Sequence, residues 1–378
     1  MGTRSADGNG SEHLSELSSE YCNDSKMDLM ECENRLIMAE VLGDRETEKA
    51  MLCEMGNVYR RRGDLEDAIH YHILYLRLAL KMGNRISENR AYENLAIDYA
   101  TLGDSKKTIH YFERVLEYFK EVGDRIKVGA AYDNIGVSHH RLGDFEKAIY
   151  YHELAIKVAE EVGDMNGKGR ACGHLGNDHY RLGNFKQAIC NHDIALEFAK
   201  ELGNRTEEGG AYGNLGLDYH RLGDFPKAIY YNELHLQFAK EMGDRKREND
   251  THGIIAIDYA NTGNFTKAIH YHELNLQYAK EVGDREEEGT AYGNLGLDYY
   301  HLGDFKKAIY YHELALEIAK KLSDRAREGK VCGYLGALYD ELGDFKNAFL
   351  YREFQKQTAE EVGHVNEEVM KLLEDWQL

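Results

Sequence analysis

A short turn signal, Gly followed by Asp or Asn, recurs every forty residues along most of the chain. The series runs from Gly43-Asp44 to Gly363, which His364 follows, an interval of 320 residues or eight periods. A second series of the same dipeptides lies twenty residues out of phase, from Gly63-Asp64 to Gly343-Asp344. Each period therefore contains two elements of similar length separated by tight turns, which is the pattern of a repeat array.

The elements between the turns are predicted to be helices. Glycine adopts the left-handed conformation that ends a helix, and Asp or Asn accepts hydrogen bonds from the free N–H groups of the next helix. In the fifth period, Tyr212, Leu215 and Tyr219 fall on one helix face. A β-propeller is excluded because its alternating strands and Trp-Asp signature are missing. The sequence predicts an all-α right-handed solenoid of eight helix-turn-helix repeats with partial caps.

The net charge and the hydropathy of the chain exclude some classes of partner. The chain has 47 basic and 67 acidic side chains, a formal net charge of −20, which repels phosphate backbones and anionic lipids. We therefore expect no nucleic acid as partner. No apolar run approaches the roughly 18 residues of a membrane span, and the N-terminus has no signal-peptide core. The six cysteines form no CxxC pair, so reduced thiols and a cytoplasmic location are expected.

The helix motif resembles a known family. Tyr212-x2-Leu215-Gly216-x2-Tyr219, followed by Ala228, is similar to the tetratricopeptide repeat. Two departures are the forty-residue period, where about 34 is usual, and Gly-Asp in place of a closing proline. Longer motifs such as GNLGLDY and GDREEEGTAYGNLG resemble the repeat half of Pins/LGN-type spindle-orientation adaptors, over about residues 45–364. The resemblance implies a protein-interaction scaffold, with polarity or spindle-type signalling complexes as the setting.

Four segments are expected along the chain. Residues 1–24 are polar and read as a disordered N-terminal segment, and residues 25–44 as a degenerate half-repeat. Residues 45–364 hold the eight forty-residue repeats, and residues 365–378 read as a C-terminal capping helix. Solenoids need such caps because an open end exposes the core.

Asparagines on the first helix of each repeat are the candidate contacts for a peptide. The resemblance places these helices on the concave side of the array and places the positions around Leu-Gly in the groove. An amide offers both a donor and an acceptor, so it can pair with the backbone of an extended peptide. Helices about 8–10 Å apart match roughly three residues of extended chain. The predicted amides are Asn94, Asn134, Asn214, Asn294 and Asn177. The alternative is that these amides hydrogen-bond within the stack.

Arginine recurs at the end of the first helix in three consecutive repeats, as Arg141, Arg181 and Arg221. On a protein of this charge, such cations could bind the carboxylates of an acidic peptide in bidentate fashion. The alternative is that they only offset the helix dipole in the last turn. The Arg of each Gly-Asp-Arg turn is interpreted as structural, because it recurs even at the ends of the array.

Catalysis and cofactor binding have no candidate residues. His72, His152, His192, His272 and His312 share one register of the second helices and are interpreted as packing residues, so no metal site is expected. Cys172 and Cys332 occupy a core register, and no phosphate-binding loop or nucleophile motif is present. The chain is expected to be a non-enzymatic scaffold for an extended peptide. Alternatives are a self-associating solenoid, through Tyr150, Tyr230 and Tyr310, or a regulatory subunit of a separate enzyme.

Overall fold

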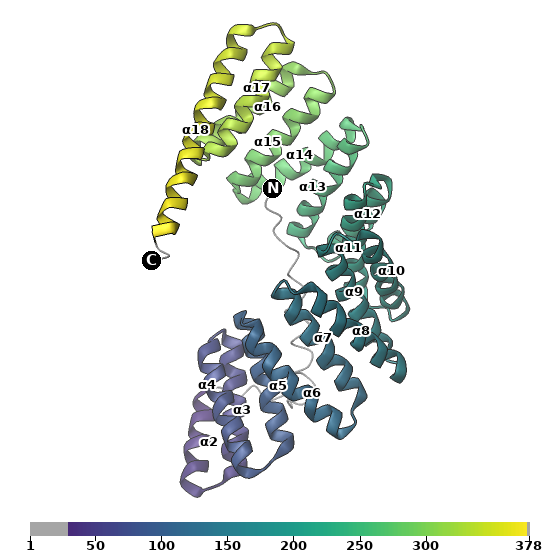
Figure 1. Cartoon of the computed structure of the whole chain (residues 1–378), viewed down its shortest axis with the longest axis vertical. Coiled ribbons are helices and arrows are strands. Elements are labelled where there is room, and N and C mark those ends of the chain that lie inside the picture. Colours follow the sequence, from purple (N-terminus) through teal and green to yellow (C-terminus); the bar gives the residue numbers. More distant parts are fainter. Residues whose placement is uncertain (1–28, 376–378) are drawn as a thin grey trace. The chain divides into compact units, whose positions relative to one another are not determined.

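The structure is a computed structural model, and it describes residues 29–375. Within this range it contains seventeen helices and no strand, so the predicted all-α array is confirmed (Figure 1). Helix α2 spans Leu29–Leu42. The first helices of the eight repeats are α3 (Arg45–Arg62), α5 (Arg85–Leu102), α7 (Arg125–Arg141), α9 (Met165–Arg181), α11 (Arg205–Leu222), α13 (Arg245–Asn261), α15 (Arg285–His301) and α17 (Arg325–Glu341). The second helices are α4 (Leu65–Met82), α6 (Ser105–Val122), α8 (Phe145–Val162), α10 (Phe185–Glu201), α12 (Phe225–Glu241), α14 (Phe265–Val282), α16 (Phe305–Lys321) and α18 (Phe345–Asp375).

The chain divides into two compact units, and each is described by itself. The first unit ends at Glu208 and the second begins at Gly209, inside α11. In the first unit, consecutive helices from α2 to α10 pack on one another, and so do consecutive helices from α12 to α18 in the second. Neighbours in sequence are therefore neighbours in space, as in a solenoid.

The turns between helices have the geometry expected from the sequence. Gly63, at φ 88°, ends α3 in the left-handed conformation, and its N–H donates to the carbonyl of Arg60. Before α3, the carboxylate of Asp44 accepts the N–H of Thr47 at 3.1 Å. Ser323 occupies a glycine register and still has a φ of 56°. The turn geometry is therefore kept even where the residue that favours it is replaced.

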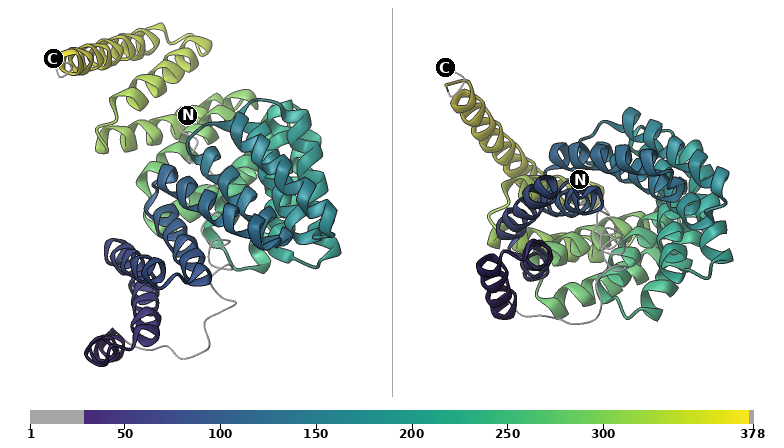
Figure 2. Two further views of the ribbon diagram at one scale, coloured as in Figure 1. Left: turned by 60° about the horizontal axis from the view of Figure 1, so that its bottom comes forward. Right: turned by 90° about the horizontal axis from the view of Figure 1, so that it is seen from below.

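The two ends of the array differ from the interior repeats. The half-repeat expected at residues 25–44 contains α2, which packs on α3. At the other end, α18 continues through Gly363, and the segment expected as a separate helix from residue 365 extends it without a turn. Figure 2 shows this long yellow helix from two further directions. The physical reason is that His364 replaces the capping Asp or Asn. Residues 1–24 lie outside the described residues, as do residues 376–378.

The structure describes five of the six cysteines and the apolar character of the helices. Cys32, Cys53, Cys172, Cys190 and Cys332 form no disulfide with one another, while Cys22 lies outside the described range. Burial raises the pKa of the Cys172 thiol to about 11, so at neutral pH it is an unreactive core group. None of the described helices combines the length and apolar character needed to cross a bilayer.

Within a repeat, glycines on the first helix make room for large side chains from the second. A Cβ placed on Gly209 of α11 would lie 2.3 Å from Cδ1 of Phe238 on α12, and Phe238 is fully buried. Gly293 of α15, in contrast, has open space where its Cβ would lie. Gly209 is therefore needed for close packing of the two helices, whereas Gly293 is not.

We expect Gly209→Ala to lower the free energy of unfolding by about 1–3 kcal/mol, because the added methyl overlaps the Phe238 ring. Gly293→Ala is the matched control and should raise it by up to about 1 kcal/mol through helix propensity alone. Urea unfolding followed by circular dichroism measures both. A Gly209→Ala variant as stable as Gly293→Ala would contradict the packing argument.

Buried polar pairs join each repeat to the next. The Nδ1–H of His72 on α4 donates to Oδ2 of Asp98 on α5 at 2.5 Å, and His272 on α14 meets Oδ2 of Asp298 on α15 at 2.7 Å. In the same register, Nδ2 of Asn232 donates to Asp258 at 3.1 Å. These side chains are almost entirely buried. His72 and His272, which share one register of the second helices, therefore each bond an aspartate on the following helix.

Two interfaces in this register lack the pair. Phe112 on α6 stands where the histidine would be, and Ser138 on α7 stands where the aspartate would be. His312 on α16 keeps the histidine, but Leu338 on α17 replaces the aspartate. Neither ring nitrogen of His312 has a hydrogen-bond partner among the described residues. Burial without a carboxylate lowers the pKa of His312 to about 4.

Candidate functional site

A partly exposed stripe runs along the first helix of each repeat. On α9 it consists of Arg170, His174, Asn177 and Arg181, spaced four, three and four residues apart, so these residues share one helix face. The first three are half-buried and Arg181 is exposed. We call these four positions, and their equivalents on the other first helices, the first-helix stripe. It carries the asparagines and arginines that the sequence predicted as peptide contacts.

Three of the predicted amides lie half-buried on this stripe. Asn134 is on α7 in the first unit, and Asn214 on α11 and Asn294 on α15 are in the second. Their side-chain amides make no hydrogen bond to another described residue. Each amide therefore retains its donors and acceptor for water or for a ligand.

The other two amides are already engaged. Asn94 is only 7% exposed, and its backbone oxygen accepts a hydrogen bond from Nη2 of Arg60 at 3.0 Å. Its Nδ2 points to Sγ of Cys53 at 3.6 Å. Oδ1 of Asn177 accepts from Nε2 of His192 at 3.2 Å. Asn94 and Asn177 therefore hydrogen-bond within the array, as the alternative interpretation stated.

The arginines at the ends of the first helices are exposed but not isolated. Nη1 of Arg141 donates to the carbonyl of Ala100, in the last turn of α5, at 3.1 Å. The guanidinium of Arg181 lies 5.6 Å from the ring centre of Phe145. Arg221 belongs to the second unit and is also exposed. Each Arg offers five N–H donors, so Arg141 keeps donors in addition to the one that caps α5.

The arginines of the Gly-Asp-Arg turns form ion pairs inside the repeat. Arg85 contacts Glu121 at 2.5 Å, and Arg245 contacts Glu281 at 2.8 Å, each joining the start of a first helix to the end of the second. Arg285 pairs with Glu288 one turn along its own helix. Their interpretation as structural residues agrees with these contacts.

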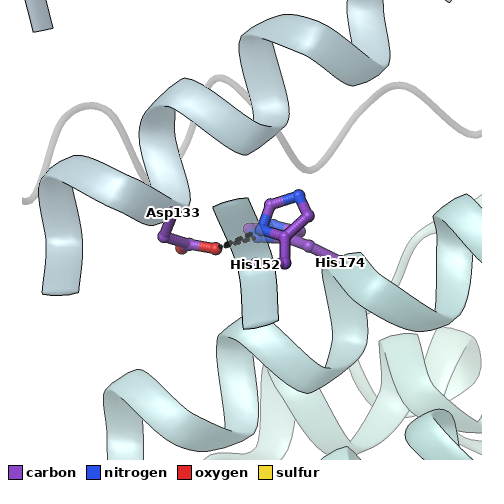
Figure 3. A group of neighbouring side chains, drawn as sticks. All are labelled: Asp133, His152 and His174. Carbon is purple, nitrogen blue, oxygen red and sulfur yellow. Dashed lines mark hydrogen bonds and ion pairs between the residues drawn. The ribbon is translucent and has the colours of Figure 1, made fainter. Parts of the chain in front are cut away.

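A cluster of two imidazoles and a carboxylate was missed by the sequence analysis. Asp133 on α7, His152 on α8 and His174 on α9 meet in the first unit (Figure 3). Asp133 and His152 are buried, and Nε of Arg170 contacts Oδ2 of Asp133 at 3.0 Å. Burial raises the pKa of Asp133, but His174, His152 and Arg170 outweigh it and hold the pKa well below its usual value.

A signal for this cluster was present in the sequence. The register of Asp133 holds Gly in the five following repeats, and the register of His174 holds Asn in four of the eight repeats. The two departures lie 41 residues apart, on consecutive first helices. Comparing consecutive repeats for positions where both differ from the common residue would have identified Asp133 and His174 as a possible contacting pair.

Comparison with protein families identifies the repeat. The model of the tetratricopeptide repeat matches residues 87–161, 170–241 and 248–321, more than half of the chain. The chain belongs to the tetratricopeptide repeat family. The search of curated proteins found no match.

Solved structures agree with this tetratricopeptide fold. A signal-transduction ATPase with a tetratricopeptide repeat sensor from Pyrococcus horikoshii aligns at a TM-score of 0.62 and 18% identity, over 96% of this chain and 53% of that chain. The apo form of the quorum sensor NprR from B. thuringiensis aligns at 0.52 and 16%, over 88% and 97%. The apo form of RapI aligns at 0.52 and 15%, over 73% and 99%. At these identities the likeness establishes the fold.

Proposed function

We propose that this tetratricopeptide repeat protein is a non-enzymatic, cytoplasmic scaffold that holds an extended peptide segment of a partner protein. The first-helix stripe is the proposed binding surface. The observation that carries the proposal is the set of half-buried amides, Asn134, Asn214 and Asn294, whose side chains make no hydrogen bond to another described residue. Such amides can pair with the backbone of a peptide whatever its side chains are.

The exposed arginines supply the proposed selectivity. Arg141 and Arg181 in the first unit, and Arg221 in the second, are cations on a chain of net charge −20. Carboxylates of a partner would bind them more strongly than neutral side chains because charge-assisted bidentate hydrogen bonds are roughly twice as strong as neutral ones. An acidic or mixed peptide is therefore the preferred class. The comparisons give no support to the spindle-type setting that the Pins/LGN resemblance implies.

The test measures peptide affinity before and after charge reversal. Peptides selected against the full chain from a display library are titrated by fluorescence anisotropy. The triple variant Arg141→Glu, Arg181→Glu and Arg221→Glu should weaken binding of acidic peptides by at least about tenfold, since each exposed charge pair contributes about 0.2–1 kcal/mol and reversal adds repulsion. Circular dichroism should show unchanged helix content.

A matched control keeps the change in net charge the same. Lys106, Lys186 and Lys306 are exposed in the first turns of second helices. Replacing all three with Glu also lowers the net charge from −20 to −26, because each exchange removes one positive and adds one negative charge. This control should bind within about threefold of the wild type if only long-range charge has changed. Equal losses in both variants would discard the specific role of the arginines.

A second candidate function is self-association through the second helices. Tyr150, Tyr230 and Tyr310 share one register, and each is 57% exposed. Exposed aromatic side chains are enriched in protein interfaces. Sedimentation velocity at several protein concentrations distinguishes the two functions, because a peptide-binding scaffold can remain a monomer whereas a self-associating array cannot.

A further inference from the structure

The cluster of Asp133, His152 and His174 has the geometry of a metal site. Oδ1 of Asp133 lies 2.9 Å from Nδ1 of His152 and 3.0 Å from Nδ1 of His174. One ligand atom from each residue lies within 4.8 Å of the other two. Ligand atoms bound tetrahedrally to zinc at about 2.0–2.2 Å are roughly 3.3 Å apart. A small outward movement of the side chains would thus place all three ligand atoms around one ion.

The outer nitrogen of His152 faces a second carboxylate. Nε2 of His152 lies 3.5 Å from Oδ2 of Asp178, and neither atom has a hydrogen-bond partner among the described residues. Oδ1 of Asp178 is held by Nδ1 of His140 at 2.6 Å. Histidines that bind metals commonly direct their other N–H to a carboxylate, which sets the tautomer.

Nδ1 of His152 can carry a proton, which it donates to Oδ1 of Asp133, or a lone pair, which a metal ion would bind. In the second case the proton lies on Nε2, which faces Oδ2 of Asp178 at 3.5 Å, and the lone pair lies on Nδ1. That lone pair and Oδ1 of Asp133 are both acceptors, 2.9 Å apart. Two acceptors at this distance repel each other unless a second proton or a metal ion lies between them. Nδ1 of His174 also faces Oδ1 of Asp133, so it too can donate a proton to that oxygen or bind the same metal ion.

Asp133 presents one of its two oxygens to the imidazoles, at a partly exposed edge of the cluster. Arg170 contacts Oδ2 of Asp133 and leaves Oδ1 to face the imidazoles. The side chain of His174 is 26% exposed. A hollow with room for about one water molecule lies between α7, α8 and α9 and is lined by Asp133 and Arg170. An ion would therefore reach the cluster from the exposed side of His174.

We propose that Asp133, His152 and His174 bind one divalent transition-metal ion of the Zn²⁺ type at the junction of the third and fourth repeats, with Asp178 orienting His152. Two imidazoles and one carboxylate match the ligand preference of zinc rather than of calcium or magnesium. The three ligands come from three helices, so the ion would join two repeats. His174 and Arg170 also belong to the first-helix stripe, but the metal site does not rest on the proposed peptide binding, because its test measures binding of the metal alone.

Another junction supplies a matched control. His272 and Asp298 form the same buried pair between the sixth and seventh repeats. The registers of Asp133 and His174 are there occupied by Gly253 and Asn294. The control junction therefore has the histidine–aspartate pair but lacks the carboxylate and the second imidazole of the proposed site.

The test titrates the full chain, prepared without a histidine tag, with Co²⁺ and follows its visible absorption. We expect one Co²⁺ per chain, displaced by one Zn²⁺. His174→Asn and Asp133→Gly carry residues that other repeats have at these registers, and each should weaken binding by at least about tenfold. His272→Asn should leave the affinity unchanged. Circular dichroism confirms that each variant is folded.

Two results would overturn the metal site. One is that the wild-type chain shows no saturable binding of a single equivalent of Co²⁺ or Zn²⁺. The other is that His174→Asn and Asp133→Gly bind the ion as tightly as the wild type, because the metal then lies at other histidines.

Discussion

Asp98→Ser should lower the free energy of unfolding by about 3–5 kcal/mol, the loss typical of removing one partner from a buried ion pair. Asp98 is completely buried, and its two oxygens contact Nε of Arg60 and Nδ1 of His72, each at 2.5 Å. Serine leaves the guanidinium of Arg60 in a part-buried position without its carboxylate. Urea unfolding monitored by circular dichroism measures the loss.

The chain itself supplies the compensating residues. One repeat further along, the same three registers hold Ala100, Phe112 and Ser138, and this apolar version packs with Phe112 only 2% exposed. The triple variant Arg60→Ala, His72→Phe and Asp98→Ser should therefore recover most of the lost stability. If the triple variant is no more stable than Asp98→Ser, the unpaired charge is not the cause of the loss.

Acid should destabilise the second unit through His312, by about 3 kcal/mol between pH 6.5 and 4. Burial lowers the pKa of His312 from 6.5 to about 4. Between these values the unfolded chain binds a proton that the folded chain does not, so the free energy of unfolding falls as the pH falls. The contribution is fully present above pH 6.5 and lost below about pH 4. Urea unfolding across this range measures it, as the difference from the variant His312→Phe.

Leu338→Asp should weaken this acid sensitivity. It places a carboxylate at the register where Asp298 meets His272, so the pKa of His312 should rise. The variant loses a buried leucine and is expected to be less stable at pH 7, but its stability should fall less steeply toward pH 4. An acid dependence equal to that of the wild type in both Leu338→Asp and His312→Phe would show that His312 is not the titrating group.

The fold was largely predictable because its determinants are local. Gly63 ends a helix and Asp44 caps one through contacts that span only a few residues. Such a local signal can be recognised in the sequence without knowing how the rest of the chain packs. The same logic failed at Gly363, where the glycine alone did not end α18.

The site was less predictable because it depends on contacts between repeats. Asn94 and Asn134 are the same residue type at the same register of consecutive repeats, yet Asn94 is buried beside Arg60 and Asn134 is half-buried. Residue type alone could not separate the two, because the neighbour that decides comes from another repeat.

Sequence alone determined that the chain is a series of paired helices and that Arg141, Arg181 and Arg221 lie near helix ends, because turns, caps and helical faces depend on residues close together in the sequence. Only the tertiary structure decided which polar side chains find partners. Asp133 meets His174 across 41 residues, and His312 lacks the aspartate that His272 has. The reason is that the burial and charge of a side chain are set by the helix packed against it, which can belong to a different repeat.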